Sequence, residues 1–513
     1  MSEANWNLNH KDLLLTILLI LVIPLAFFIL PETIPAGKGF GYDGVMYAKM
    51  VIEIDNMISN GELSAYYSQR ILPALLVRSG LMSLGLPLEA NYVIWGFRAL
   101  NFTLILISLA FWLAIAQRIG ITRTAYWIGV LGLFFCFPNA KEILYHPVRT
   151  DHFAFMLGLA LAWSYVTKQL LAIAFFSIVG AFVWQISGIV GLALILSTLI
   201  EPGDQHILTP KFIKNSYKKI NRFTIIASLS LATIIALPDI FGIDLQPLIS
   251  WRSFANDPFT RFLTNIPVLT LVSLFIIRLY ADTFSSGWKR STKLASIAKI
   301  LILIIVILIL PKTILTTIEN PKLPLPGMNG SLDILRELLV GRVREGMIFL
   351  PFVAHSVYYG PVFILFILMW KECSKATVNI GLGFVIAASI FAVMSIFSES
   401  RFNFMLWPFV VIITTKALSQ LRINKITNIL IAATAIGLSK AWFVINQDEW
   451  PLPDYSALYE SPKSLYFAHH GPWMSVENYI LQGSILIVLY LAFFMLLRNS
   501  RSNQLRSESK DKP

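Results

Sequence analysis

Residues 171–200 read LAIAFFSIVGAFVWQISGIVGLALILSTLI, a long apolar run that the stretch WQISG at 184–188 interrupts near its middle. A helix that crosses the hydrocarbon core of a bilayer upright needs roughly 20 apolar residues, at about 1.5 Å per residue. The run is too long for one such helix, and its polar break lies where a turn between two helices would fall. We therefore predict two short helices that meet near Gln185.

The charges on either side of this run decide how often it crosses the membrane. Basic residues gather in short loops between the other apolar runs, which is typical of cytoplasmic loops. These loops all lie on one side only if 171–200 crosses twice, whereas one tilted helix would put the later loops outside. We therefore predict two crossings and cytoplasmic termini. The basic residues that support this are Arg118, Arg123, Lys211, Lys214, Lys218, Lys219, Arg222, Arg278, Lys289, Arg290, Lys293, Lys371, Lys375, Lys416, Arg422, Lys425, Arg498, Arg501 and Arg506.

The composition excludes a soluble globular protein. The chain has 513 residues, of which 56% are hydrophobic and 14% are charged, and its mean hydropathy is +0.69. Apolar runs of spanning length recur along the whole chain, so we expect spanning helices rather than a barrel. The net charge of +12 lies in the short loops, which argues against a nucleic-acid partner. The two cysteines, Cys136 and Cys373, are too few for a disulfide framework or a cysteine-based metal site.

We predict an all-α fold, a polytopic transmembrane helical bundle of about fourteen spans that forms one domain over residues 1–497. The polar residues 498–513 are expected to form a disordered cytoplasmic tail. No small-residue cleavage site follows the first apolar run, so we expect an uncleaved first helix in a multi-pass protein of the plasma (bacterial inner) membrane. The expected spans are 12–30, 92–116, 124–138, 153–167, 171–200 (crossing twice), 223–242, 262–279, 300–317, 352–370, 378–397, 402–418, 427–445 and 479–497.

The outer face carries the remaining polar loops, namely 31–91, 139–152, 243–261, 318–351, 398–401 and 446–478. In the first loop, Asp43 precedes apolar residues at helical spacing over 47–58, which predicts an amphipathic helix in the interface plane. A second helix is expected from Ile71 with Pro73 in its first turn, and a further interfacial helix within 318–351. Asp43 is either an N-cap or a catalytic carboxylate, and Arg70 either pairs with lipid phosphate or belongs to a site.

The loop 139–152 holds seven ionisable groups between two apolar runs, in the sequence NAKEILYHPVRTDH. Such a density at a membrane boundary is costly unless the groups pair or face a wet cavity. Asp151 is the second candidate carboxylate, and the alternative is that it caps the helix that follows. His146 and His152 lack the fixed spacing of a metal-binding pair, so no metal site is predicted. Arg98, inside the second apolar run, either belongs to a functional site or reaches back to the interface.

Two short segments resemble membrane glycosyltransferases of the GT-C class, which includes the protein O-mannosyltransferases and the lipid A aminoarabinose transferases. DGVMYAKM at 43–50 resembles their first-loop motif, in which an acidic residue follows the first span and Tyr-Ala opens an interfacial helix. SRFNFMLWP at 400–408 is similar to the Arg-Tyr-x-Leu-Pro pattern that opens a late span, with Phe402 for tyrosine and Pro408 slightly later than usual. Many members carry a second acidic residue where this chain has Gly44, which weakens a two-carboxylate or metal-assisted mechanism.

The resemblance implies an enzyme that takes a sugar from a polyprenyl phosphate carrier and passes it to an acceptor on the extracytoplasmic face. Transfer needs a base for the acceptor hydroxyl, which we assign to Asp43, with Asp151 as the second carboxylate. It also needs cations around the departing lipid phosphate, and the arginine fork binds two phosphate oxygens at once. The side chains expected to bind the substrate or its phosphate are Tyr47, Arg70, Arg98, Lys141, Arg149 and Arg401. The sequence leaves open the sugar, the acceptor and the use of a divalent metal as cofactor.

Two other functions stay open at this point. A transporter or flippase would account for the break at Gln185 and the intramembrane Arg98, although we see no internal repeat of the kind common in transporters. An O-antigen-type polymerase or ligase would share the lipid-linked substrate and the arginine-rich outer loops. An outward cavity that joins Asp43 and Arg401 with the other candidates would favour a transferase. A cavity that alternates across the midplane would favour a transporter.

Overall fold

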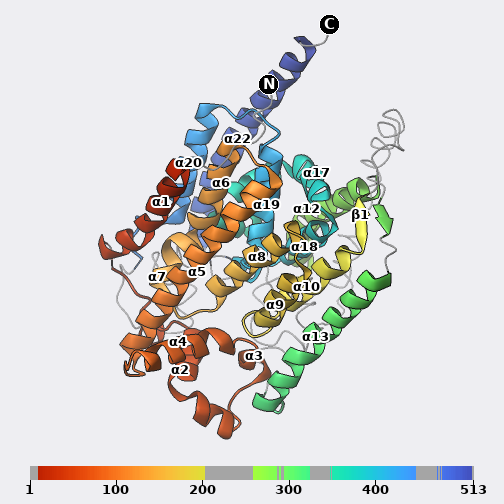
Figure 1. Cartoon of the computed structure of the whole chain (residues 1–513). Helices are drawn as coiled ribbons and strands as arrows, with labels where there is room; N and C mark the ends of the chain where they lie inside the picture. Colours follow the sequence, from red (N-terminus) through yellow and green to blue (C-terminus); the bar gives the residue numbers. More distant parts are fainter. Residues whose placement is uncertain are drawn as a thin grey trace.

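The chain folds into a bundle of helices (Figure 1). The computed structural model describes residues 10–29, 31–202, 258–285, 288–290, 294–323, 347, 349–445, 471, 474 and 476–510. In these residues the only strands are β1 (Ile200–Pro202) and β2 (Trp288–Arg290), a short antiparallel pair in which Glu201 faces Lys289. The predicted helical architecture is therefore confirmed. The predicted span at 223–242 and most of the helix expected within 318–351 lie outside the described residues.

Four helices in the described part of the chain are long and apolar enough to cross a membrane. They are α5 (Ala90–Ile119), α12 (Pro258–Ser285), α13 (Leu294–Ile318) and α22 (Val476–Lys510). A fifth span results if α6 (Arg123–Phe134) and the segment Pro138–Tyr145, bent by 56° at a short break, are taken together.

Shorter helices fill the rest of the bundle. The predicted span 352–370 is divided at Gly360, whose φ of 76° ends one helix before Pro361 starts the next. These helices include α1 (His10–Ile29), α3 (Ala65–Ser68), α7 (Ile143–Tyr145), α8 (Asp151–Val166), α15 (Leu350–Tyr359), α16 (Pro361–Leu368), α17 (Trp370–Ile380), α18 (Leu382–Met394), α19 (Trp407–Leu418) and α20 (Lys425–Ser439).

The run 171–200 forms two helices, as its polar break predicts. α9 (Leu170–Gly180) and α10 (Ile186–Ser197) pack side by side as an antiparallel hairpin. Small residues allow this close approach, because a Cβ on Gly191 would lie 1.7 Å from Oγ of Ser177 and one on Gly180 would lie 2.3 Å from Cβ of Ser187. The tip of the hairpin, residues 181–185, lies near loop 31–91, and the carbonyl of Phe182 accepts a hydrogen bond from the backbone N–H of Leu72 at 3.1 Å.

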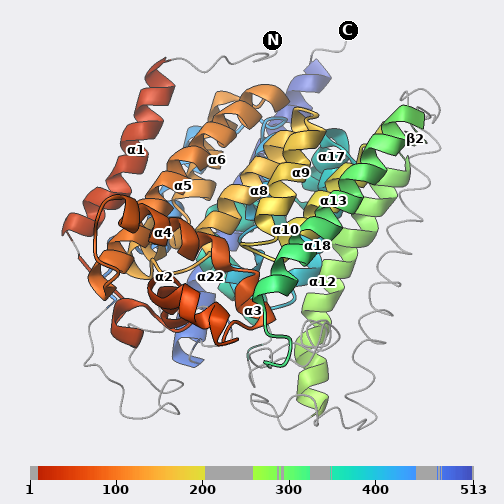
Figure 2. The same cartoon turned by 60° about the horizontal axis from the view of Figure 1, so that its bottom comes forward.

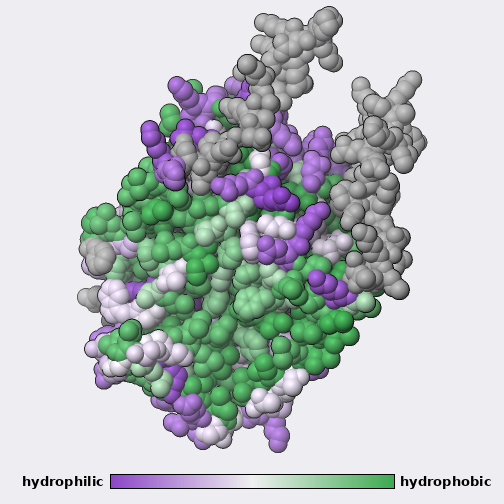
Figure 3. Space-filling model, in the orientation of Figure 1, coloured by the Kyte–Doolittle hydropathy of each residue, from purple (hydrophilic) through white to green (hydrophobic). Residues whose placement is uncertain are grey.

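The surface has the character of a membrane protein. Figure 3 shows a broad hydrophobic band with hydrophilic residues gathered at both ends of the molecule. Exposed apolar side chains line α13 and α22, among them Ile302, Ile309, Ile487 and Val488. A soluble protein rarely exposes so large an apolar surface, whereas a bilayer covers it.

Loop 31–91 folds into helices at the opposite end of the bundle from the C-terminal end of α22 (Figures 1 and 2). α2 (Gly44–Ser59) buries the predicted apolar face from Tyr47 to Met57, and only Ile58 stays exposed. This face packs on α4 (Ile71–Ser83) and on the start of α5, so the protein covers much of the surface that we expected to face lipid. Arg78 of α4 fixes this packing, because its guanidinium donates to the carbonyls of Val51 and Ile52.

The C-terminal segment corrects one prediction. We expected residues 498–513 to be disordered, whereas α22 continues through residues 498–510 to Lys510. No glycine or proline interrupts this segment before Pro513, and Arg501 forms an ion pair with Glu372 of α17 at 2.8 Å. Arg501 therefore gives this part of the helix a tertiary contact.

Candidate functional site

Loops 31–91 and 139–152 interlock to position Asp43. The N–H of Ile34 donates to the carbonyl of Tyr145 at 2.8 Å, which ties loop 31–91 to loop 139–152. Two glycines then let the backbones meet. A Cβ on Gly41, where φ is +76°, would lie 1.9 Å from Nε2 of His146, and one on Gly44 would lie 2.8 Å from the carbonyl oxygen of Val148. Asp43 lies between these two contacts, so its backbone is held directly over loop 139–152.

This packing explains why position 44 is a glycine. An acidic side chain there would start at a Cβ already too close to a backbone carbonyl, so the site has no room for a second carboxylate beside Asp43.

We expect Gly44→Ala to destabilise the protein by about 1–3 kcal/mol, because the added methyl overpacks against the backbone of Val148. Gly80→Ala is the matched control, since Gly80 is a helical, exposed glycine with open space at its Cβ position. Thermal unfolding in detergent checks both variants. Equal midpoints for the two would show that the contact between Gly44 and Val148 is not tight.

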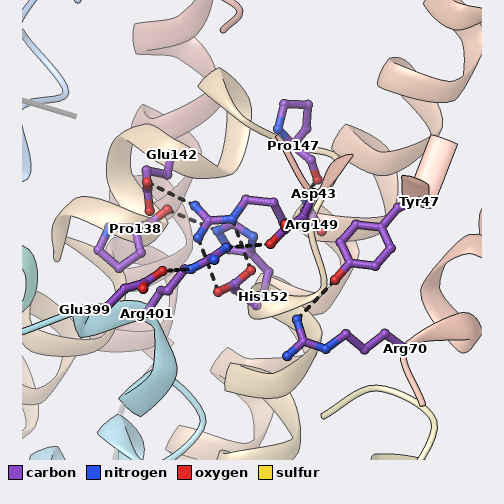
Figure 4. A network of polar contacts seen from close by, with 12 residues as sticks. Asp43, Tyr47, Arg70, Pro138, Glu142, Pro147, Arg149, His152, Glu399 and Arg401 are labelled. Atoms are coloured by element: carbon purple, nitrogen blue, oxygen red, sulfur yellow. Dashed lines mark hydrogen bonds and ion pairs between the residues drawn. The ribbon is translucent and has the colours of Figure 1, made fainter. Parts of the chain in front are cut away.

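Asp43 occupies the N-cap position of α2, but its side chain makes no capping hydrogen bond. Its Oδ2 instead accepts a hydrogen bond from Nη1 of Arg401 at 3.0 Å, and Nε of Arg401 donates to Oε1 of Glu399 at 2.5 Å (Figure 4). The side chains of Asp43 and Arg401 are 28% and 27% exposed, so both are accessible at the surface of the protein.

A second, fully buried network lies next to this pair. Arg149 donates through Nε and Nη2 to the two carboxylate oxygens of Asp151, at 3.1 and 3.3 Å. Its Nη1 donates to Oε1 of Glu142 at 3.0 Å, and Glu142 also accepts from the hydroxyl of Tyr358 at 3.1 Å. Asp151 lies in the first turn of α8 but does not occupy the cap position, which Thr150 takes. The guanidinium of Arg149 is thus committed to two carboxylates.

Arg70 is held in a different way. Its guanidinium lies 4.1 Å from the ring centre of Tyr66 and 4.4 Å from that of Trp184, and its Nη1 donates to the hydroxyl of Tyr47 at 3.1 Å. Among the described residues no carboxylate bonds to it, and its buried Nε has no hydrogen-bond partner. Cation–π contacts orient an arginine without occupying its donors. Arg70 therefore keeps hydrogen-bonding capacity for an anion.

The charges set the protonation states at neutral pH. Burial raises the pKa of the Asp43 carboxyl, but Arg401 and then Arg70 lower it by more, so the pKa lies below its usual value. For Asp151, burial likewise raises the pKa, and Arg149 and Arg401 lower it by more. Both carboxyls are therefore ionised at pH 7. Burial raises the pKa of Glu142 by more than Arg149 lowers it, so Glu142 is the carboxyl that protonates most easily.

The structure brings together six of the eight predicted site residues, namely Asp43, Tyr47, Arg70, Arg149, Asp151 and Arg401. Arg98 and Lys141 have other partners. Arg98 donates to the carbonyl of Leu144 and the hydroxyl of Thr33, and Lys141 forms a buried ion pair with Glu32 at 2.5 Å. We assign both to the framework that holds loop 139–152 in place.

Several site residues were missed by the sequence analysis. They are Tyr66, Glu142, Trp184, Tyr358 and Glu399. Of these, Trp184 could have been predicted, since it lies in the polar break of 171–200.

His152 donates from Nε2 to the carbonyl of Pro138 at 3.1 Å, and burial lowers its pKa to about 4, so its imidazole is neutral at pH 7. In the part of the chain that the structure describes, no three His, Cys, Asp or Glu side chains are grouped as metal ligands.

The cluster combines two ionised carboxylates, two cations with accessible or unused donors, and a third cation that fixes one carboxylate. Such a site can accept a proton from a hydroxyl and hold an anionic group beside it. No family model matches this chain, and neither the curated proteins nor the solved structures contain a match.

Proposed function

We propose that the protein is a membrane glycosyltransferase that moves a sugar from a polyprenyl phosphate carrier to an acceptor on the extracytoplasmic face. The observation that carries the proposal is the ion pair of 3.0 Å between Asp43 and Arg401. These residues belong to the two segments that resemble GT-C enzymes, and 358 positions separate them in the chain. Two short motifs that lie far apart in the sequence thus meet in one cluster.

The residues divide the chemistry between them. Asp43 is the base that takes the proton of the acceptor hydroxyl as its oxygen bonds to the anomeric carbon of the sugar. The bond from that carbon to the phosphate oxygen breaks, and its electron pair stays on the lipid phosphate. Arg401 and Arg70 donate hydrogen bonds to this phosphate, where negative charge grows in the transition state. The bound phosphate also draws the Arg401 guanidinium away from Asp43. Because Arg401 is the group that lowers the pKa of Asp43 most, this movement raises that pKa and makes the carboxylate a stronger base.

Arg149 was predicted to bind the phosphate, but we assign it a different role. Its donors are used by Asp151 and Glu142, so it holds the Asp151 carboxylate in place rather than the substrate. Asp151 then contributes negative charge near the sugar, where a carboxylate stabilises developing positive charge on the ring.

The setting of this site extends the proposal. About fourteen crossings with both termini in the cytoplasm would place the Asp43 cluster on the outer side of the plasma membrane. The lipid-linked donor would then reach the cluster from the bilayer, and the acceptor from the extracytoplasmic space.

A transporter is supported less well. The break in 171–200 favoured it, but that break presents Trp184 to Arg70 and so belongs to the outer cluster. In proteoliposomes a flippase would move a labelled lipid-linked sugar between leaflets and leave its sugar–phosphate bond intact. A transferase breaks that bond.

Binding of the bare carrier tests the phosphate site. We expect polyprenyl phosphate at about 100 times its Kd to stabilise the protein by about 2.7 kcal/mol, and polyprenol of the same length to have a much smaller effect. Arg401→Ala should lose most of the difference between the two lipids, whereas the exposed Arg422→Ala should keep it. Equal shifts of the unfolding midpoint with both lipids would contradict a phosphate site at Arg401.

A further inference from the structure

One buried ionisable side chain near the site has no part in the chemistry described above. His355 lies in α15, inside an otherwise apolar run, and is 1% exposed. Its Nδ1 is 2.8 Å from Oγ of Ser400, and its Nε2 is 3.0 Å from the carbonyl oxygen of Ser395. An ionisable residue at membrane depth is costly, and it usually serves a functional site.

The contact with Ser395 indicates the tautomer of this histidine. A carbonyl oxygen only accepts hydrogen bonds, so Nε2 carries the proton that is donated to Ser395, and the backbone of Phe397 is a further hydrogen-bond acceptor beside the ring. In the neutral ring, Nδ1 is then an acceptor, and the hydroxyl of Ser400 must donate to it. His355 thus bridges the end of α18 and the turn η4 (Ser400–Asn403), and the direction of both hydrogen bonds follows from the geometry.

The backbone of the same serine is held as well. The hydroxyl of Tyr359, one turn along α15, donates to the carbonyl of Ser400 at 2.6 Å. Tyr359 is itself fixed by stacking on Trp407, with ring centres 4.3 Å apart, and Trp407 donates to the carbonyl of Gly132 at 2.8 Å. Side chain and main chain of Ser400 are therefore both anchored to the bundle core.

The other side of this turn is packed against backbone. Gly471, with φ of +85°, lies so close to Ser398 that an added Cβ would be 2.1 Å from its carbonyl oxygen. The residues on either side of Ser400 are Glu399 and Arg401, which bond to each other at 2.5 Å. Whatever holds Ser400 also sets where the Arg401 guanidinium lies relative to Asp43.

We propose that His355 is a positioning residue, which acts through the Ser400 hydroxyl to hold Arg401 beside Asp43. The hydrogen bond from Ser400 to Nδ1 carries this role, whereas the bond from Nε2 to Ser395 orients the ring. The expected effect of His355 substitutions on catalysis rests on the proposed function, whereas their expected effect on the turn Ser400–Asn403 does not.

Two isosteric substitutions separate these bonds. The amide oxygen of asparagine lies near the place of Nδ1, so His355→Asn keeps the acceptor for Ser400. The amide nitrogen of glutamine reaches the place of Nε2, so His355→Gln keeps the donor to Ser395 and loses the acceptor. Each variant is neutral and loses one hydrogen bond, so we expect similar, small decreases in the unfolding midpoint.

The turn itself gives the first measurement. The N–H groups of Phe402 and Phe404 bond to the carbonyls of Glu399 and Arg401, so their hydrogen exchange reports whether the turn is held. We expect exchange in His355→Gln to be about fivefold faster than in the native protein, and exchange in His355→Asn to stay close to native. Ser400→Ala should match His355→Gln, and combining the two should add little, since both remove the same bond.

The second measurement is turnover of a labelled polyprenyl phosphate sugar. His355→Gln should raise the KM for this donor about fivefold with a smaller change in kcat, and His355→Asn should not. Equal exchange rates in the Asn and Gln variants would overturn the positioning role. A clear difference in exchange, with no donor cleaved by the native protein, would leave the positioning role standing and count against the proposed function.

Discussion

Arg149→Met lowers the free energy of unfolding by about 3–5 kcal/mol, which is the expected cost of removing one partner from a buried ion-pair network. The loss is large because Asp151 and Glu142 both bond to this guanidinium, and all three side chains are almost fully buried. Methionine fills a similar volume, so most of the effect comes from the uncompensated carboxylates. Thermal unfolding in detergent measures it, with the exposed Arg422→Met as the control.

The pH dependence of this variant gives an independent check. In the native protein the pKa of Asp151 lies below its usual value of 3.8, so its contribution to stability is present above about pH 4 and is lost as the pH falls further. Without Arg149, burial dominates, and the pKa of Asp151 should rise. The variant should then become more stable relative to the native protein as the pH falls from 7 to 5. A deficit that stays constant over this range would indicate lost packing rather than unpaired charge.

Asp43→Asn lowers kcat by about 10²–10⁴-fold, the usual contribution of a general base. Asparagine caps helices as well as aspartate does, so a role as a cap would leave the variant active. The native kcat/KM, which reports the free enzyme, should not fall between pH 7 and pH 5, because the pKa of Asp43 lies below its usual value and the base stays ionised. Donor turnover in proteoliposomes measures both effects.

The control for this variant is Glu53→Gln, which removes an exposed carboxylate from the same helix, α2. It should keep native turnover. If Asp43→Asn were as active as Glu53→Gln, then the ion pair with Arg401 would be structural, and the base would have to be another group.

Local pattern was enough to predict much of the fold around the site. The spacing of apolar residues over 47–58 predicted the helix α2 and its apolar face, although not that the protein would bury that face, and the polar break near Gln185 predicted the α9–α10 hairpin. Both follow from helix periodicity and from the length that a bilayer requires, which a short window of sequence reveals. The helical end of α22 was missed because the partner of Arg501, Glu372, lies 129 positions away.

The site was only partly predictable for the same reason. Asp43 and Arg401 could be named because each lies in a recognisable segment, but nothing in either segment showed that they pair. Which arginine is committed to carboxylates and which keeps free donors depends on contacts between distant elements. Arg149 meets Glu142 across one loop, while Arg70 meets Trp184 from another helix pair. Such partners follow from tertiary packing.

The most direct test of the account is whether the native protein cleaves the bond between a sugar and its lipid phosphate. Proteoliposomes that contain the native protein would receive labelled polyprenyl phosphate sugars and an envelope extract as the source of acceptors. Release of bare polyprenyl phosphate would then be followed, with the heat-denatured protein and Asp43→Asn in parallel. We predict that the native protein alone releases it from at least one donor. Donors that bind the native protein, seen as a raised unfolding midpoint, and yet all stay intact would contradict the account.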